Sequence, residues 1–431
     1  MPAFRHFQEG FVYDVAGTSL FANDIDLQNR ILGFCNSIVA RKLLEALSPT
    51  LNFEVGQISS LPIREEAGDA SVVHRLIDIS REDWDQRETS WNFAIHPLIE
   101  LALDGLLLKN TYNSLRENWR RNSVEMQCLE RANNKAFIDA FRLGDEIEAD
   151  VSIKQVSLFC NPAYRYSESN DDEASEELLL TDSMKELISY AVGCMMGRYS
   201  LDEPGLIYAH AGNTGFNPGR YEKKFPADAD GIVPITDERW FDEDAACRMR
   251  EFLRAVWGRD TLEENIAWLA ESLGTKASET SDETIRRYIS EKFFKDHLQT
   301  YKKRPIYWLF TSGKQGAFQA LVYLHRYNEG TLARMRAEYV VPLIAKMVSR
   351  LDMLGKDLAA ASSAAARTKL QKQIEALRKK QVELLAYDEK LRHYADMRIT
   401  LDLDDGVKVN YAKFGDLVAE SKAITGGKEE D

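Results

Sequence analysis

The stretch from Val340 to Leu391 decides the fold of the C-terminal part of this 431-residue chain, and it reads VVPLIAKMVSRLDMLGKDLAAASSAAARTKLQKQIEALRKKQVELLAYDEKL. Apolar residues recur in it at alternating spacings of four and three, the pattern of a helix that packs along another helix. They are Val340, Ile344, Met347, Leu351, Leu354 and Leu358, and then Leu370, Ile374, Leu377, Leu384 and Leu391. Ser362 and Ser363 interrupt the pattern and predict a turn. The stretch therefore predicts an antiparallel helical hairpin, with arms of about thirty residues and about 45 Å.

Two features of this stretch predict departures from an ideal hairpin. Pro342 stands near the start of the first arm, and because proline lacks a backbone donor we expect a kink or a helix boundary there. Gln381 and Asp388 occupy seam positions in the second arm. Polar residues disturb an apolar seam, so we expect imperfect pairing of the arms at these two positions.

Apolar spacing predicts further helices outside the hairpin. Asp26–Leu47, Asp69–Leu143 and Thr261–Phe294 carry apolar residues at helical intervals. Within the second range, Trp84 and Trp91 are large apolar side chains that we expect to anchor the core. Helix is thus the predicted majority structure.

A smaller number of segments predict strands. Gly10–Val15 alternates as a strand does, and Asn52–Ile63 is expected to form short strands. Ile306–Phe310 reads as a buried strand, followed by a turn at Thr311–Lys314 and a helical run at Phe318–Tyr327. The fold class is therefore α+β, built of several segments and predominantly helical, with small mixed sheets and the C-terminal antiparallel helical hairpin.

Polar segments mark the expected loops and the divisions of the chain. Ser167–Glu177 is acidic, Ala211–Pro226 is rich in glycine, asparagine and proline, and both predict loops. From Ser421 the tail is polar and is expected to be disordered. The predicted segments are 1–65, 66–145, 146–330, 331–400 and 401–431.

Composition describes an ordinary soluble multidomain protein, with 44% hydrophobic and 29% charged residues. No apolar run approaches the ~20 residues that span a bilayer, and no secretory signal is apparent, so a cytoplasmic location is expected. The five cysteines lie far apart, which disfavours disulfide scaffolds and zinc ribbons. The net charge of -14 argues against a protein that coats DNA indiscriminately. It suits contacts with basic partners.

Motifs for common chemistries are incomplete in this chain. Gly212, Gly215 and Gly219 lack the Gly-Lys-Ser/Thr ending of a phosphate-binding loop, and Ser312-Gly313-Lys314 lacks its upstream glycine. The seven histidines include no pair at helical metal-binding spacing. The acidic run Asp171-Asp172-Glu173 is typical of a solvated loop. We therefore expect no metal site and no nucleoside triphosphatase.

Asn161-Pro162-Ala163-Tyr164 resembles the Asn-Pro-Pro-Tyr loop with which amino-methyltransferases hold a flipped adenine. Such a loop needs a glycine-rich cofactor motif on a preceding strand, and residues 1–160 contain none. The alternative interpretation is a turn capped by the asparagine, with tyrosines packed against it. We expect no catalytic residue and no cofactor-binding residue here.

Several longer phrases carry a resemblance to a known family. FCNSIVA at 34–40, SPTLNFEVGQI at 48–58 and LPI at 61–63 resemble the end of a specificity domain in adenine-specific DNA methyltransferases. More narrowly, the chain up to about residue 411 resembles the PglX methyltransferases of BREX phage-defence systems. The phrases that carry this second resemblance are LIDISREDWD at 76–85, ETSW at 88–91, MKELISYA at 184–191, GLIY at 205–208 and KRPIYWLF at 303–310.

The resemblance implies a recognition role for this region. In that family the S-adenosylmethionine site and the catalytic motif lie upstream, and the complete protein methylates adenine N6 to mark host DNA. Segment 1–65 would then be the end of a target-recognition domain, so that the chain begins inside a domain, and 66–145 a helical spacer. Segment 146–330 would be a C-terminal α/β region before the hairpin. Implied partners are double-stranded DNA, the upstream methyltransferase domain, other BREX proteins and a phage-encoded inhibitor.

Basic residues supply the candidate DNA contacts. Lys302, Lys303 and Arg304 precede the predicted 306–310 strand, and Lys314 follows it at an expected helix N-terminus, a position suited to phosphate. Residues 331–400 hold fourteen lysines and arginines against eight acids, a net +6 in a chain of -14. Within them stands the cluster Arg378, Lys379 and Lys380. The expected DNA-binding residues are therefore these seven.

Two alternatives remain open from the sequence. As a second hypothesis, the hairpin and the acidic surfaces fit an interaction module that binds partner proteins or an inhibitor and contacts no DNA. A self-contained methyltransferase would need a cofactor site that the motifs do not reveal, and for it we expect no heat on titration with S-adenosylmethionine.

Overall fold

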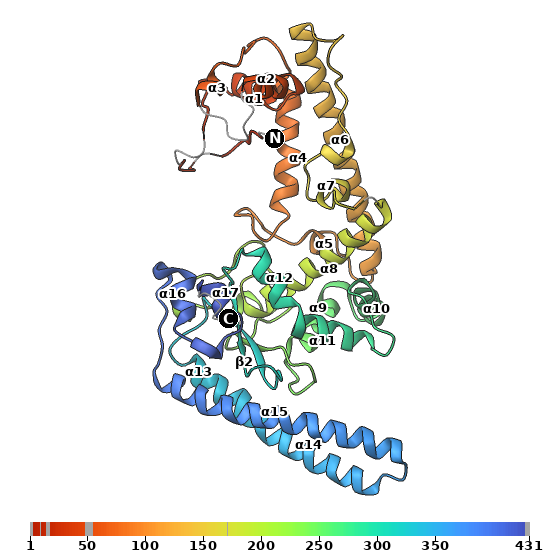
Figure 1. The fold of residues 1–431 in the computed structure, drawn as a ribbon, viewed down its shortest axis with the longest axis vertical. Coiled ribbons are helices and arrows are strands. Elements are labelled where there is room, and N and C mark those ends of the chain that lie inside the picture. Colours follow the sequence, from red (N-terminus) through yellow and green to blue (C-terminus); the bar gives the residue numbers. More distant parts are fainter. Residues whose placement is uncertain (1–2, 9, 14–17, 48–54, 170, 427–431) are drawn as a thin grey trace. The chain divides into compact units, whose positions relative to one another are not determined.

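The computed structural model describes residues 3–8, 10–13, 18–47, 55–169 and 171–426. The chain divides into two compact units (Figure 1). Unit 1 comprises residues 1–90 and 113–179, and unit 2 comprises residues 91–112 and 180–431. By their bounds, helices α6 and α8 contribute residues to both units.

The regular elements in the described residues of unit 1 are all helices, because long amphipathic runs dominate its sequence. Its elements are α1 (Ile25–Cys35), α2 (Ile38–Leu47), α3 (Val55–Ser59), α4 (Ala70–Asp85), most of α6 (Leu108–Phe141), the short turn η1 (Ile153–Gln155), α7 (Pro162–Arg165) and the start of α8 (Asp172–Met196).

The junction between α1 and α2 packs on α6 and forms the core of unit 1. Phe34 stacks on Phe141 with ring centroids 5.6 Å apart. The Asn133 amide donates to the Gly33 carbonyl (2.9 Å), and the Asn134 side chain accepts from the Ile38 N–H (2.9 Å). The FCNSIVA phrase at 34–40 is therefore a packing motif that joins two helices to a third.

Gly33 allows this close approach, which gives a testable consequence. A Cβ at Gly33 would stand 2.7 Å from both Asn133 Oδ1 and Val73 Cγ2, closer than real contacts allow. We expect Gly33→Ala to destabilise the chain by about 1–3 kcal/mol through overpacking. Gly355, also inside a helix, meets nothing within 4 Å, so Gly355→Ala should instead stabilise by about 0.5–1 kcal/mol. Urea unfolding measures both, and a loss of stability in both variants would contradict the steric argument.

Buried polar contacts hold the rest of unit 1 together. The Asp83 carboxylate at the end of α4 accepts the backbone N–H groups of Phe159 (2.7 Å) and Cys160 (2.9 Å). Arg116 makes a bidentate pair with Glu176, with both distances 2.7 Å. Asp83 belongs to the LIDISREDWD phrase, so this phrase also serves packing.

Unit 2 combines helices with a small sheet. Its elements are α5 (Pro97–Glu100), the start of α6, the rest of α8, η2 (Ala211–Asn213), η3 (Pro218–Arg220), β1 (Ile232–Pro234), α9 (Ala245–Trp257), α10 (Leu262–Ser272), α11 (Ser281–Glu291), α12 (Phe293–Thr300), β2 (Tyr307–Thr311), β3 (Gln319–Tyr323), α13 (Thr331–Arg334), a π-helical turn η4 (Met335–Val340), α14 (Val341–Ala360), α15 (Ala364–Asp396), η5 (Leu403–Asp405), α16 (Gly406–Ala412), η6 (Gly415–Leu417) and α17 (Ser421–Thr425).

The sheet is antiparallel with strand order β1-β3-β2. Trp308 lies opposite Val322 in the β2–β3 pair, and Val233 lies opposite Leu321 in the β1–β3 pair. Trp308 also packs on Tyr411 and Phe414, with ring centroids 5.1 and 5.6 Å away. The C-terminal segment thus covers β2, which explains why this strand is apolar at every position but its last.

A buried histidine sets the start of β2. His297 Nε2 accepts the N–H groups of Ile306 (3.0 Å) and Tyr307 (3.2 Å), which requires that nitrogen to be unprotonated. The imidazole is 3% exposed, and burial lowers its pKa to about 3. The strand formed by the KRPIYWLF phrase therefore starts at backbone N–H groups that donate to the His297 imidazole.

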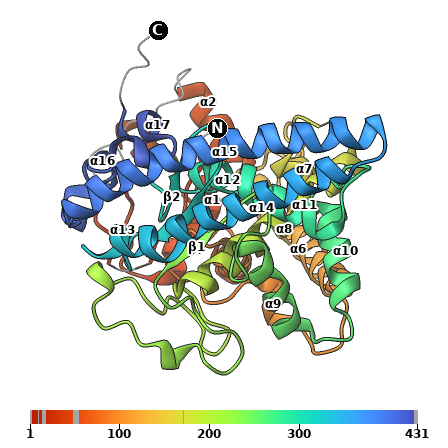
Figure 2. The same cartoon turned by 90° about the horizontal axis from the view of Figure 1, so that it is seen from below.

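The predicted C-terminal hairpin is present. The helical stretch α13, η4 and α14 covers residues 331–360, and α15 covers 364–396, so the turn falls at Ser362 and Ser363 as expected. Every predicted seam residue is buried or half-buried. Figure 2 shows α14 and α15 lying side by side along their length. The structure confirms the predominantly helical α+β class with this hairpin.

The two expected irregularities of the hairpin have structural explanations. A π-helical turn ends at Val340, and Pro342 is the second residue of α14. The change from π-helix to α-helix therefore falls where the proline lacks a backbone donor. Asp388 accepts a bidentate pair from Arg336 of that π-helical turn, at 2.7 and 3.0 Å. An ion pair therefore replaces apolar contact at this seam position.

Several local predictions were wrong, and the first concerns β3. Phe318–Tyr327 was expected to be helical, but Gln319–Tyr323 is the central strand. A short continuous apolar run is compatible with either state, and pairing with β1 and β2 decides it. Conversely, Val55–Ser59 is helix where strands were expected, and Ser48–Glu54 lies outside the described residues. Residues 10–13 form no strand, and Asp14 and Val15 lie outside the described residues.

The predicted ends of helices and the tryptophans also need correction. Helix α8 begins at Asp172, inside the expected loop, because acidic residues favour a helix N-terminus and Asp171 accepts the Glu173 N–H (2.9 Å). The tail forms α17 at Ser421–Thr425 before the described residues end. Trp84 is 45% exposed and Trp91 is 91% exposed, so neither anchors the core.

Candidate nucleic-acid interface

The positive charge of the hairpin is concentrated in its outer half. Residues 349–380 contain eight lysines and arginines and three acids, which leaves only a small excess in the remainder of 331–400. Seven of these eight side chains are exposed, and Lys380 is the exception. They are Arg350, Lys356, Arg367, Lys369, Lys372, Arg378, Lys379 and Lys380. We call this set the arm cluster.

The inner half of the hairpin uses its cations within unit 2. Arg336 pairs with Asp388, Lys390 pairs with Asp416 and Arg398 pairs with Glu329. Lys346 donates to the Trp240 carbonyl (2.6 Å) and lies 4.9 Å from the centre of the Phe241 ring. The Arg336–Asp388 pair joins the two arms, and the other contacts attach the inner half to neighbouring segments of unit 2. The exposed side chains of the arm cluster form the positive surface of the outer half.

Of the three predicted DNA-binding residues on α15, Lys380 differs from Arg378 and Lys379. Arg378 and Lys379 are exposed. Lys380 forms an ion pair with Asp237 at 2.5 Å, and its side chain is 13% exposed. Lys380 therefore attaches α15 to the segment after β1, while its two neighbours face solvent.

Lys314 lies at the tip of the β2–β3 hairpin. The expected helix N-terminus after it is absent, because Gly313–Gly316 forms a β-turn closed by the Gly316 N–H to the Gly313 carbonyl (3.1 Å) and a strand follows. Glu383 of α15 holds this turn: its carboxylate accepts from Ser312 Oγ (2.7 Å), the Gln315 N–H (2.7 Å) and the Ala317 N–H (3.2 Å). The turn is thereby joined to the arm.

Lys302, Lys303 and Arg304 lie at the opposite end of β2 from Lys314. All three side chains are exposed. The neighbouring Tyr301 hydroxyl contacts Arg198 Nη1 at 3.0 Å, which adds a fourth cation at this end. The structure therefore brings Lys314 close to α15, and it leaves the 302–304 group as a separate basic site.

Lys302 and Lys303 adopt left-handed backbone conformations, with φ of 51° and 61°. Each side chain in this region costs about 1 kcal/mol relative to glycine. We expect Lys302→Gly and Lys303→Gly each to stabilise the chain by about 0.5–1 kcal/mol while removing a charge. Urea midpoints check this, with Arg304→Gly as the control, since Arg304 has no positive φ. Destabilisation by both lysine variants would show that the side chains have a packing role.

Asn161 serves the local backbone. It is 2% exposed, and its amide nitrogen donates to the carbonyls of Ile153 and Val156, both at 2.8 Å. We expected the asparagine to cap this turn, but its side chain makes no capping hydrogen bond to α7. It stabilises the turn that precedes α7 instead. Tyr164 is 43% exposed. Asn161-Pro162-Ala163-Tyr164 therefore differs from a methyltransferase loop, in which the asparagine amide is available to bind the flipped adenine.

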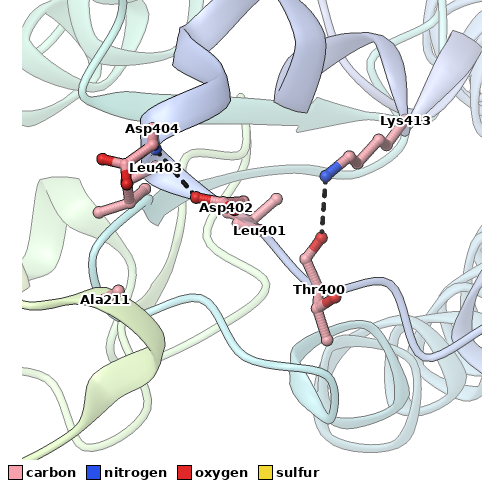
Figure 3. Close-up of a pocket in the computed structure, with 7 residues that line it drawn as sticks. All are labelled: Ala211, Thr400, Leu401, Asp402, Leu403, Asp404 and Lys413. Atoms are coloured by element: carbon pink, nitrogen blue, oxygen red, sulfur yellow. Dashed lines mark hydrogen bonds between the residues drawn. The ribbon is translucent and has the colours of Figure 1, made fainter.

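A pocket of about 460 Å³ lies in unit 2 (Figure 3). It is lined by Ala211, Thr400, Leu401, Asp402, Leu403, Asp404 and Lys413. Lys413 Nζ donates to the Thr400 carbonyl (3.2 Å), and the Asp402 carboxylate accepts the Asp404 N–H (3.0 Å). These polar groups hold their own segment, so the pocket shows no set of acid, base and nucleophile.

Two other kinds of site are not found in the described ranges. No three His, Cys, Asp or Glu side chains there are grouped so that they could hold a metal ion. None of the helices in the same ranges is both long and apolar enough to cross a membrane.

Comparison with known proteins identifies relatives. The chain is 45% identical over 437 residues to the adenine-specific methyltransferase BrxX of Escherichia coli O9:H4 (strain HS), a match that covers 99% of this chain and 36% of BrxX. It is 37% identical over 431 residues to the adenine-specific methyltransferase PglX of Lacticaseibacillus casei (strain Zhang), covering 98% of this chain and 34% of PglX. The chain is homologous to a region of the BrxX/PglX adenine-specific methyltransferases. It spans about a third of their length. No family model matches the chain.

The structure shows what the sequence phrases shared in the resemblance to BrxX and PglX do in this chain. FCNSIVA, LIDISREDWD and KRPIYWLF supply core packing and internal hydrogen bonds, as Ile38, Asp83 and Tyr307 illustrate. The exposed cations of the arm cluster outside 378–380, together with Glu383 and Gln315, were not among the predicted site residues. The sequence could have revealed these cations if the net charge had been counted separately for each half of the hairpin. Only the fold brings Glu383 to the turn.

Proposed function

We propose that this chain is the DNA-recognition and assembly region of a BREX PglX-like, site-specific N6-adenine DNA methyltransferase that marks host DNA in phage defence. Its homology to BrxX and PglX supports the family assignment. In this proposal the S-adenosylmethionine site and the catalytic motif belong to an upstream methyltransferase domain. Segment 1–65 ends the target-recognition domain, 66–145 is a helical spacer, and 146–330 and 331–400 form the C-terminal α/β region and the hairpin, followed by the 401–431 tail.

The arm cluster carries the DNA-binding part of the proposal. In a chain of net charge -14, an excess of five positive charges on one exposed length of helical hairpin is a local exception. Phosphate binding draws on clustered lysine and arginine side chains. Within the arm cluster, Lys356 pairs with Asp352 and Lys380 pairs with Asp237, and the other six cations have exposed side chains. In the inner half of the same hairpin, three of the six cations pair with Asp388, Asp416 and Glu329. The contrast within one structural element favours a nucleic-acid contact over a merely solvated face.

The experiment is a titration of the chain with a fluorescent duplex of random sequence at several salt concentrations. If the arm cluster binds phosphates through six or more contacts, affinity should fall by about 10³-fold or more between 50 and 200 mM salt. Absence of binding at 50 mM salt would refute the DNA-contact proposal for this chain.

A protein-interaction module is the second candidate, and a specific observation favours it. Met353 and Val382 on the hairpin are 54% and 69% exposed, and Leu385 is 47% exposed. Exposed apolar side chains on a long helix pair suit a partner helix or another BREX protein, and the acidic surfaces suit a basic partner. Weak or absent duplex binding, together with unchanged assembly when the arm cluster is neutralised, would support this candidate over the first.

A further inference from the structure

The β2–β3 turn has features of a base-reading element. Lys314 and Gln315 are the two central residues of the Gly313–Gly316 β-turn, and both side chains are exposed. The glycines at the two ends have φ of 133° and 60°, conformations that other residues rarely adopt. The turn at the end of the β2–β3 pair thus presents one cation and one amide.

Side-chain and backbone hydrogen bonds fix the conformation of the β2–β3 turn, although the turn is exposed. Three donors from residues 312–317 point at the single carboxylate of Glu383, which is half-buried. The Ser312 N–H also donates to the Phe318 carbonyl (2.9 Å), which continues the strand pairing up to the turn. A side chain reads a base edge well only when its backbone is already in place, and this turn meets that condition.

A basic stripe leads away from the turn along α15. Lys369, Lys372 and Lys379 precede Glu383 at successive spacings of three, seven and four residues, which return to the same side of a helix. All three lysines are exposed. A duplex whose phosphates lie along this stripe would extend toward the turn that Glu383 holds.

We propose that the β2–β3 turn reads DNA sequence, with Gln315 on a base edge, Lys314 on a phosphate and Glu383 as the positioning residue. In the major groove a glutamine amide can pair bidentately with adenine N6 and N7. This inference rests on the proposed function and deepens it, because it assigns part of the sequence discrimination to a residue outside segment 1–65.

The test compares the duplexes that the whole chain selects from a randomised library. The wild-type chain should enrich a base preference, and Gln315→Ala should reduce the discrimination at one position roughly tenfold while affinity for random duplex stays within about twofold. Gln373→Ala, an exposed glutamine on α15 outside the turn, is the matched control and should leave the preference intact. Lys314→Ala should weaken all sequences alike and lower the salt slope by about one.

Glu383→Gln separates positioning from general damage. The amide cannot accept all three hydrogen bonds, so discrimination should fall as in Gln315→Ala, whereas random duplex should bind at least as tightly because a negative charge is removed. If the chain binds duplex but shows no preference, or if Gln315→Ala leaves the preference unchanged, the base-reading inference is wrong and the proposed function survives. If the chain binds no duplex at low salt, the proposed function itself is wrong.

Discussion

Replacing Arg367, Lys369, Lys372, Arg378 and Lys379 by glutamine should lower the affinity of the chain for random duplex on the order of 10²-fold or more, and should reduce the salt slope by up to about four. The reason is counterion release: each phosphate that a cation neutralises frees a condensed ion, and these five exposed side chains belong to the arm cluster. Fluorescence anisotropy between 50 and 200 mM salt measures both quantities.

A matched control removes the same charge elsewhere. Lys42, Arg120, Arg131, Lys135 and Lys276 have exposed side chains, and each pairs with a carboxylate of its own unit. Their joint change to glutamine lowers the net charge equally but should alter duplex affinity far less. Equal losses in the two variants would mean that net charge, and not the arm, governs binding. Such a result would contradict the assignment of the interface to the arm cluster.

The stability of the chain should fall as the pH drops from about 6.5 toward 3, in part because of His297. Its folded pKa of about 3 lies below the ordinary value of 6.5, so in this window the unfolded chain binds a proton that the folded chain excludes. One such proton costs about 1.4 kcal/mol of unfolding free energy per pH unit. Between pH 6.5 and 4.5 this single group should therefore remove roughly 2–3 kcal/mol.

His297→Gln isolates this contribution. The glutamine carbonyl can accept from the Ile306 and Tyr307 N–H groups, but it does not titrate. At pH 8 the variant should be the less stable protein, because its side chain fits the site less well. The difference from the wild type should shrink as the pH falls from 7 to 5, and urea unfolding at each pH follows it. A difference that stays constant over this range would rule out the buried neutral imidazole as the cause.

The helices of this chain follow from local sequence to different degrees. The α14–α15 seam could be predicted because a spacing of four and three residues records burial along one side of a helix, whatever the rest of the fold does. Strand β3 could not, because Gln319–Tyr323 is short and apolar, and only its pairing with two other strands distinguishes it from a buried helix. Trp91 shows a related limit of sequence-based prediction. Its large apolar side chain suggested burial, but burial depends on whether another element covers it, and Trp91 is exposed.

The candidate site divides in the same way. Sequence showed that the hairpin is basic and singled out Arg378, Lys379 and Lys380, but the fold commits Lys380 to Asp237 while its neighbours stay exposed. Those two partners are 143 residues apart along the chain. No local pattern reports such a pairing, since it depends on where β1 ends relative to α15.

By itself, the sequence determined the helical hairpin, its turn at Ser362 and Ser363, its positive charge and the resemblance to the PglX methyltransferases. These properties depend on the spacing, charge and identity of residues that are close together along the chain. Only the tertiary structure decided which cations remain exposed, which end of β2 meets α15, and that Glu383 holds the Lys314–Gln315 turn. The physical reason is that ion pairs and hydrogen bonds between distant residues form only once packing has brought their elements together.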